Sequence, residues 1–444
     1  MRASSLKYAI LTWVSTFVLL IFLLMPFHAF LTVWLSSHFG HYTALRLWKE
    51  VLLLLSVVGV LILLALDHKI RSHTLSRRLT QLILAYCLVT VIWGLVSYVH
   101  HDVSAKALGY GLIVNLRFPI FFLVCWAVSL RTKRIHNPWR VALIVPSIIV
   151  VTFGILQAKV LPYDFLKHFG YTSQTIFPYE TINHNIHYLR AMSTLRGANP
   201  LGAYLLLPIS YLTVLIARGH RKWQNVALLV ASLLTLYFSF SRSAWIGVAF
   251  SIALIVWLNV RSPKLRQKLI LAALALVVIL AGAGYGLRNH PTAQNLIQHT
   301  QSHSAAKQSS NAGHVAALKN NLPDLWQEPL GRGPGTAGPA SIYNGSHPSR
   351  IAENYFVQIG QEVGLIGLVL FLLINVGVGY LLWCRRADPL AMALFASLIG
   401  LSFINLLSHA WTDDTLAYVW WGLAGIAMVS TEPIGPKRQA HEKA

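Results

Sequence analysis

Residues 238–250 read FSFSRSAWIGVAF, and long apolar runs lie on both sides of this stretch. Each run approaches the ~20 residues that a helix needs to span a bilayer. Similar runs recur along the 444-residue chain, which is 55% hydrophobic and 11% charged, whereas soluble domains are about 25% charged. The sequence therefore predicts an all-α integral membrane protein. Arg242 stands out within this stretch, because a charge at the centre of a membrane helix costs ~2.5 kcal/mol or more.

The apolar runs predict about 12 transmembrane helices. We expect them at residues 8–34, 46–66, 79–99, 107–130, 139–157, 199–217, 223–240, 243–260, 269–286, 355–383, 389–408 and 415–430. Lys and Arg are concentrated in every second connection and in both terminal tails. Connections rich in Lys and Arg face the cytoplasm. The termini are therefore expected in the cytoplasm and the opposite connections in the periplasm of a bacterium.

Two predicted periplasmic connections, 158–198 and 287–354, are much longer than the ~4–6 residues of an ordinary connection, and long connections are often functional. The chain then divides into helices 1–5 (1–157), a periplasmic segment (158–198), helices 6–9 (199–286), a large periplasmic loop (287–354), and helices 10–12 with a cytoplasmic tail (355–444). Within 158–198, the stretch LPYDFLKHFG is expected to be an interfacial helix, with Phe165, Leu166 and Phe169 on the membrane. The working surface is expected to be periplasmic.

Arginines stand where two predicted spans begin on the periplasmic side. Arg242 lies between Ser241 and Ser243, and Arg196 precedes Asn199, a candidate helix cap. The first N–H groups of a helix and its dipole favour an anion, and an arginine fork binds phosphate through two hydrogen bonds. Two such arginines could hold a pyrophosphate. The alternatives are that Arg242 reaches back to carbonyls and water, and that Arg196 belongs to an ordinary basic loop.

Four more basic residues are candidates for binding an anionic substrate. Lys49 and Glu50 lie at the apolar start of the second span, where they either belong to the site or neutralise their neighbours. Arg117 lies inside the fourth span, and an arginine at that depth is either a functional group or a hydrogen-bonding hub. Arg190 and Arg350 lie in the two long outer connections.

The large outer connection ends in a glycine-rich turn, EPLGRGPGTAG (328–338), followed by the polar residues His347, Glu353 and Asn354. Glycines permit a tight turn and a close approach of the backbone. A carboxyl group near the bilayer surface could have a raised pKa, and Glu353 could then act as a general base. The alternative is a solvated loop carboxylate. No Walker loop or aspartate-rich motif is visible, so no metal, nucleotide or other cofactor is expected.

The order of these motifs resembles the O-antigen ligase and polymerase superfamily of bacterial inner membranes. The resemblance rests on the Ser-Arg segment at 239–247 and on 310–367, where a Pro-Leu-Gly-x-Gly-x-Gly turn is followed by a polar pair, nine residues and Gly-Leu-Ile-Gly. In the family the polar pair usually begins with histidine, whereas this chain has Glu353. The family also tends to have an arginine before the turn, where His314 is the nearest candidate. Either Glu353 replaces the family's histidine, or His314 or His347 supplies the imidazole.

The resemblance implies a C-type glycosyltransferase-like fold and transfer, in the periplasm, of a glycan from undecaprenyl pyrophosphate to a sugar hydroxyl of lipid A–core. Arg242 and Arg196 would bind the pyrophosphate, and Glu353 or a nearby histidine would activate the acceptor. The remaining candidates for binding or supporting the substrate are Asn354, Arg350, Arg117, Lys49 and Arg190. Membrane lipids are the other expected partners, and nucleic acid is not expected. The alternatives are an O-antigen polymerase, a protein O-oligosaccharyltransferase and, from another class, an organic-anion transporter.

Overall fold

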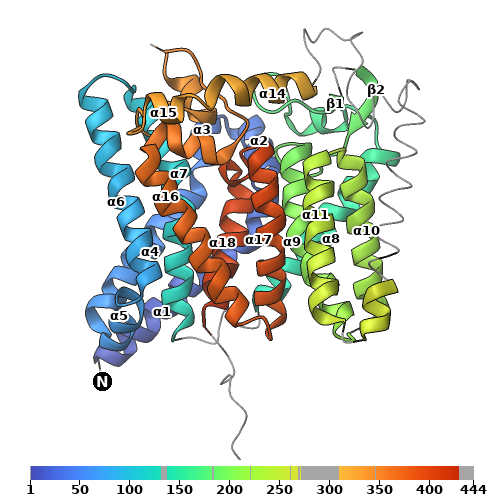
Figure 1. Cartoon of the computed structure of the whole chain (residues 1–444), viewed down its shortest axis with the longest axis horizontal. Coiled ribbons are helices and arrows are strands. Elements are labelled where there is room, and N and C mark those ends of the chain that lie inside the picture. The colour runs from blue at the N-terminus through green and yellow to red at the C-terminus, as the bar shows by residue number, and fades with distance from the viewer. Residues whose placement is uncertain are drawn as a thin grey trace, which may run out of the picture.

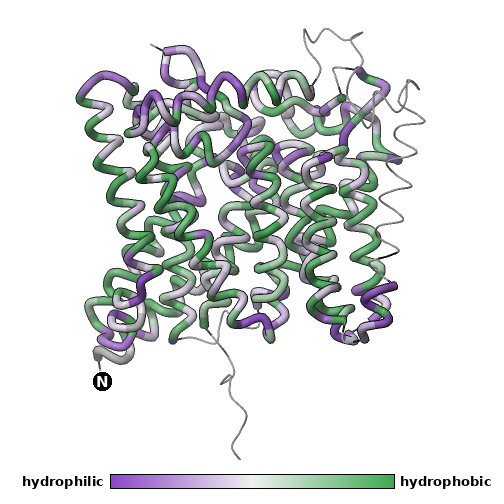
Figure 2. The backbone as a smooth tube through the Cα atoms, viewed as in Figure 1, coloured by the Kyte–Doolittle hydropathy of each residue, from purple (hydrophilic) through white to green (hydrophobic). Residues whose placement is uncertain are grey.

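The computed structural model describes residues 2–131, 138–182, 185–220, 222–260, 262–268, 271, 310–345 and 347–429. Long helices run side by side in one bundle, and several of the short helices gather with a two-stranded sheet at one end, which is at the top of Figure 1. Apolar residues, coloured green, cover the sides of the bundle, and polar residues, coloured purple, are concentrated at its two ends (Figure 2). The prediction of a helical membrane protein is confirmed.

Nine stretches among the described residues are long and apolar enough to cross a membrane. They are Ser5–Phe39, which joins α1 (Arg2–Leu24), η1 (Met25–Phe27) and α2 (His28–Phe39), and then α4 (Trp48–Leu66), α6 (Arg78–Val99), α7 (Ala105–Ser129), α8 (Pro138–Lys159), α9 (Ala198–Ala217), α11 (Arg242–Asn259), α16 (Tyr355–Cys384) and α17 (Pro389–Leu407).

The other three of the 12 predicted spans differ from these nine. Two are shorter helices, α10 (Trp223–Ser239) of 17 residues and α18 (Asp414–Ala427) of 14 residues. The third, 269–286, lies outside the described residues except for residue 271.

Short elements complete the described part of the chain. The short helices are α3 (Tyr42–Arg46), α5 (His68–Leu75), η2 (Phe165–Phe169), α14 (Ser310–Asn321), α15 (Asp324–Gln327), η4 (Gly338–Tyr343) and η5 (Ala410–Thr412). The strands β1 (Glu180–Ile182) and β2 (Asn185–Arg190) pair antiparallel, so that Glu180 lies opposite Arg190. In Figure 1, α14 crosses the top of the bundle and the strands lie beside it.

The short helix α18 lies at the centre of the bundle. All 14 of its residues are buried, and it packs along α7 and against α17 and α9. Trp420 and Trp421 on α18 pack against each other and against Trp411 of η5. A helix that is apolar on all faces needs neighbours on all faces. This position explains how a helix too short to cross the whole bilayer fits within the bundle.

The glycine-rich turn fits into a kink in α16. At Gly364 the backbone leaves the helical conformation, with a φ of +73°. The N–H groups of Arg332 and Gly333 donate to the carbonyls of Gln361 and Glu362 just before this kink, each over 2.8 Å. Breaking a helix inside a membrane leaves backbone groups without partners, and the turn supplies them.

The same turn also packs tightly against the backbone of α7. Gly335 has a φ of +93°, and a Cβ atom there would lie 2.2 Å from the carbonyl oxygen of Ala107. The Gly335 N–H donates to the Glu362 carboxylate over 2.8 Å, and Asn115 of α7 donates to the other carboxylate oxygen over 2.8 Å. The glycines are therefore explained by packing between the outer loop and two membrane helices.

The prediction of an interfacial helix at 161–170 is wrong. Only residues Phe165–Phe169 are helical, as the 3-10 helix η2, and Leu166 is fully buried. Leu166 packs with Val33, Tyr171 and Met192, because the segment folds back onto the end of α2. It contributes to a small core of its own.

We expect Gly335→Ala to destabilise the protein strongly, because the new methyl group meets the α7 backbone and the positive φ alone costs about 1–3 kcal/mol for a residue other than glycine. Gly313→Ala on α14 is the matched control, since a Cβ there meets nothing within 4 Å. Thermal unfolding of both purified variants in detergent measures the difference. Equal unfolding temperatures would contradict the packing role of the turn.

Candidate functional site

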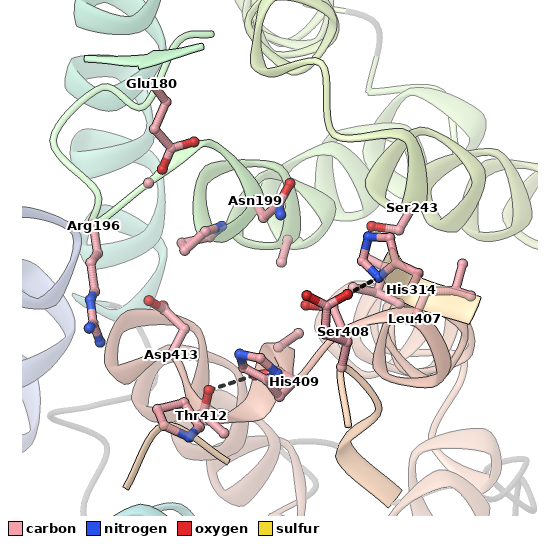
Figure 3. Close-up of a pocket in the computed structure, with 17 residues that line it drawn as sticks. Glu180, Arg196, Asn199, Ser243, His314, Leu407, Ser408, His409, Thr412 and Asp413 are labelled. Atoms are coloured by element: carbon pink, nitrogen blue, oxygen red, sulfur yellow. Dashed lines mark hydrogen bonds and ion pairs between the residues drawn. The ribbon is translucent and has the colours of Figure 1, made fainter. Parts of the chain in front are cut away.

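A polar cavity of about 350 Å³ lies at the end of the bundle where the short elements gather. Its walls come from the start of α9, the start of α11, the link between α17 and α18, the residue before the cap of α16, and α14 (Figure 3). The polar side chains that line it are those of Glu180, Arg196, Asn199, Ser243, His314, Glu353, Ser408, His409, Thr412 and Asp413. The cavity thus combines a cation, several carboxylates and two imidazoles.

Arg196 lines this cavity, as expected for a residue that binds an anionic substrate. It directly precedes Gly197, the extended N-cap residue of α9. Figure 3 shows its guanidinium on the same side of the cavity as Asp413. A narrower extension of about 20 Å³ is lined by Arg196, Asp413 and Arg46. Arg196 therefore stands where the two spaces meet.

The expected cap of α9 is corrected by the structure. Asn199 lies inside the first turn, and its side-chain oxygen accepts a hydrogen bond from Arg190 over 2.6 Å. The N–H of the buried first residue of the helix, Ala198, instead donates to the Glu180 carboxylate over 3.2 Å. A carboxylate thus occupies the helix end where an anion is favoured.

Arg190 is held by three protein groups at the edge of the cavity. Its Nε donates to the carbonyl of Ser239 over 2.9 Å, its Nη2 donates to Asn199, and its Nη1 lies 3.6 Å from Glu180. Burial lowers the pKa of this guanidinium. Arg190 therefore joins the end of α10 to the start of α9.

Arg242 is the first residue of α11, as the sequence predicts. The preceding turn passes through Phe240, whose φ of +48° lets the chain reverse between α10 and α11. Arg242 is half-buried and is not among the residues that line the cavity, whereas its neighbour Ser243 is. The two predicted pyrophosphate ligands thus differ, because Arg196 lines the cavity and Arg242 does not.

Glu353 and His314 form an ion pair in the cavity (Figure 3). The side chains come from two different elements, since His314 lies on α14 and Glu353 precedes the cap of α16. Each is 39% exposed. The hydrogen bond from His314 lowers the pKa of the Glu353 carboxyl, so the expected rise in that pKa is wrong. Glu353 also has a φ of +51°, an uncommon conformation for a residue other than glycine.

The link between α17 and α18 supplies two titratable cavity residues, His409 and Asp413, that the sequence analysis missed. Burial lowers the pKa of His409 and raises the pKa of Asp413. One Asp413 oxygen accepts the N–H of Leu416 over 3.0 Å and so caps α18. The signal in the sequence was the polar stretch at 408–414 between two very apolar runs.

Arg117 and Lys49 belong to a buried ion cluster around Asp414. Arg117 pairs with Asp414 and donates to the Thr412 carbonyl over 2.5 Å. Lys49 lies 3.1 Å from Asp414 and 3.0 Å from Glu50. Neither Arg117 nor Lys49 lines the cavity. Their contacts instead fix the link that forms one of its walls.

The remaining three candidates also lie outside the cavity lining. Asn354 caps α16 by accepting the N–H of Val357 over 3.1 Å, and it donates to the Leu406 carbonyl over 3.0 Å. Arg350 pairs with two carboxylates of the α15 region, and His347 is exposed. Asn354 therefore places its neighbour Glu353, while Arg350 holds the outer loop together.

Asp414→Asn should lower the unfolding temperature substantially, because it leaves Arg117 and Lys49 buried with too little negative charge. Breaking a buried ion pair on one side typically costs about 3–5 kcal/mol. Asp164→Asn, which removes an exposed ion pair with Lys167, should leave that temperature unchanged. Thermal unfolding followed by size-exclusion chromatography compares the two. An Asp414 variant as stable as the control would show that the cluster does not support the bundle.

Comparison with known proteins finds a family similarity for part of the chain. None of the curated proteins matches the chain. The family model described as O-antigen ligase matches residues 227–372, a region that includes Arg242, His314 and Glu353. The same region contains the Ser-Arg segment, the glycine-rich turn and the Gly-Leu-Ile-Gly motif that carry the resemblance in the sequence. Residues 227–372 are therefore similar to the O-antigen ligase family.

Proposed function

We propose that this protein is an O-antigen ligase, which transfers a glycan from undecaprenyl pyrophosphate to a sugar hydroxyl of lipid A–core at the periplasmic face of the inner membrane. The family match supports a ligase- or polymerase-type function. The observation that carries the proposal is that one cavity at the end of the helix bundle is lined by both Arg196 and the Glu353–His314 pair. A cation for the leaving group and a base for the acceptor thus line the same space.

Arg196 is proposed to bind the pyrophosphate of the donor. Pyrophosphate is already a good leaving group, so the reaction needs charge stabilisation more than a general acid. A guanidinium at the cavity supplies that charge and can form two parallel hydrogen bonds with phosphate oxygens. Arg242, which precedes the lining residue Ser243 in the chain, is proposed to add positive charge near the cavity.

Glu353 is proposed to take the proton of the acceptor hydroxyl. The hydroxyl oxygen forms a bond to the anomeric carbon, the bond from that carbon to the pyrophosphate oxygen breaks, and the proton moves to the carboxylate. His314 keeps Glu353 ionised and orients it. A single displacement of this kind inverts the anomeric centre. Asp413 is the second candidate for the base, because it lines the same cavity and its pKa is raised.

The charge at the opposite end of the bundle supports a periplasmic cavity. The described connections there carry Arg77, Arg78, Arg218, Lys222, Arg385 and Arg386. Connections of this composition face the cytoplasm, so the cavity is assigned to the periplasmic side. Both proposed substrates are lipid-linked anions, and a polar cavity at the end of a membrane bundle suits them.

Arg196→Gln should reduce transfer by at least ~100-fold, if the guanidinium contributes ~2.7–4 kcal/mol to transition-state stabilisation, as one oxyanion ligand does. Arg332→Gln, at the same end of the bundle but exposed and paired with Glu328, is the matched control and should retain activity. The assay uses purified protein in liposomes with an undecaprenyl-pyrophosphate glycan and lipid A–core. Glycosylated lipid A–core is the product of a ligase, whereas longer undecaprenyl-linked chains would identify a polymerase. Undiminished transfer by the Arg196 variant would contradict the phosphate assignment.

The pH dependence of transfer should report the Glu353–His314 pair. Transfer requires the carboxylate, so activity should be lost as the pH falls through the lowered pKa of Glu353. His314→Gln removes the hydrogen bond that lowers this pKa, and the loss should then begin at a higher pH. His347→Gln, outside the cavity, should leave the acid side of the profile unchanged. If His314→Gln leaves it unchanged but Asp413→Asn abolishes transfer, Asp413 is the base.

A further inference from the structure

A second concave surface lies at the opposite end of the bundle from the cavity. A groove of about 520 Å³ is formed where α8 and α10 begin and α9 ends. The polar cavity lies at the start of α9 and the groove lies at its end, so the length of α9 separates the two spaces. The groove shares no lining residue with the cavity. It is therefore a separate site.

The groove is apolar along the helices and basic at its rim. Ile144 and Ile148 of α8 and Leu228 of α10 form its wall, and Ile148 is 46% exposed on the outside of the bundle. Arg140 and Lys222, both exposed, lie at the helix starts that form the rim. An apolar wall that opens toward the lipid and ends at two cations has the polarity of a bound lipid, with its chain along the wall and its headgroup at the rim.

The charge of the rim selects the headgroup. None of the described residues that line the groove is acidic. Asp388, next to the lining residue Pro389, accepts the N–H groups of Leu390 and Ala391 and so caps α17. Two cations without a lining carboxylate favour an anionic headgroup over a zwitterionic one, because juxtamembrane Lys and Arg attract anionic lipids.

We propose that this groove binds a phospholipid with an anionic headgroup, with the phosphate between Arg140 and Lys222 and an acyl chain against Ile144, Ile148 and Leu228. In the proposed topology this is a lipid of the cytoplasmic leaflet. The lipid joins α8, α9 and α10 at the ends far from the cavity. Arg190 joins α9 and α10 at the near ends. The inference is independent of the proposed transfer reaction.

Native mass spectrometry of the full chain, released from nanodiscs of phosphatidylglycerol or of phosphatidylcholine, tests the proposal. We expect the wild-type protein to retain phosphatidylglycerol and not phosphatidylcholine. Each basic residue contributes about 1 kcal/mol to binding an anionic lipid. The double variant Arg140→Gln/Lys222→Gln should therefore retain at least roughly tenfold less phosphatidylglycerol than the wild-type protein. Arg386→Gln is the matched control, since Arg386 stacks on Trp383 as Arg140 stacks on Trp139, at the same end of the bundle but outside the groove.

Two further arms distinguish a lipid seated in the groove from a free anion held by the two cations alone. Leu228→Trp, which fills the wall without a change of charge, should also reduce retention of phosphatidylglycerol. Inorganic phosphate at the same concentration should not displace the lipid. Equal retention by the double variant and the Arg386 control, equal retention of the two lipids, or displacement by inorganic phosphate would overturn the proposal.

Discussion

The buried charge of Asp414 is the constraint on which the rest of the site depends. A carboxylate at this depth persists only with partners, and Arg117, Lys49 and His28 supply them from three different helices. These contacts fix the start of α18, and with it the link at 408–413 that forms one wall of the cavity. The arginine and lysine inside the apolar spans thus have a structural explanation, and the cations available to a ligand are those nearer the cavity.

The outer loop is fastened to the membrane helices by backbone contacts rather than by side chains alone. The glycine-rich turn supplies hydrogen-bond partners to the kinked α16 and packs against α7, while Asn354 caps α16 and reaches α17. Glu353 lies between these two attachments, in a backbone conformation that they impose. The polar residue that faces the cavity is therefore held by its neighbours on both sides. A motif that invites a phosphate-binding interpretation is explained here by the geometry of a loop on a helix.

The sequence predicted the features that depend on local composition. Apolar runs located the membrane helices, and the positions of Arg196 and Arg242 at helix starts followed from the interruptions between those runs. It did not predict which side chains meet. His314 and Glu353 pair although they belong to different elements, and Arg117 contacts Asp414, which lies 297 residues further along the chain. Such contacts are set by the packing of whole helices. Glu353 and His314, two of the three residues that the sequence left as alternatives for the base, are each other's partners.

The His314–Glu353 contact joins two parts of the molecule with different attachments. Glu353 belongs to the anchored end of α16, whereas His314 is carried by α14, a helix that lies across the mouth of the bundle (Figure 1). The pair therefore connects α14 to the start of α16. A chamber of about 350 Å³ is far smaller than a polysaccharide, so in the proposed reaction only the end of a long glycan fits inside it.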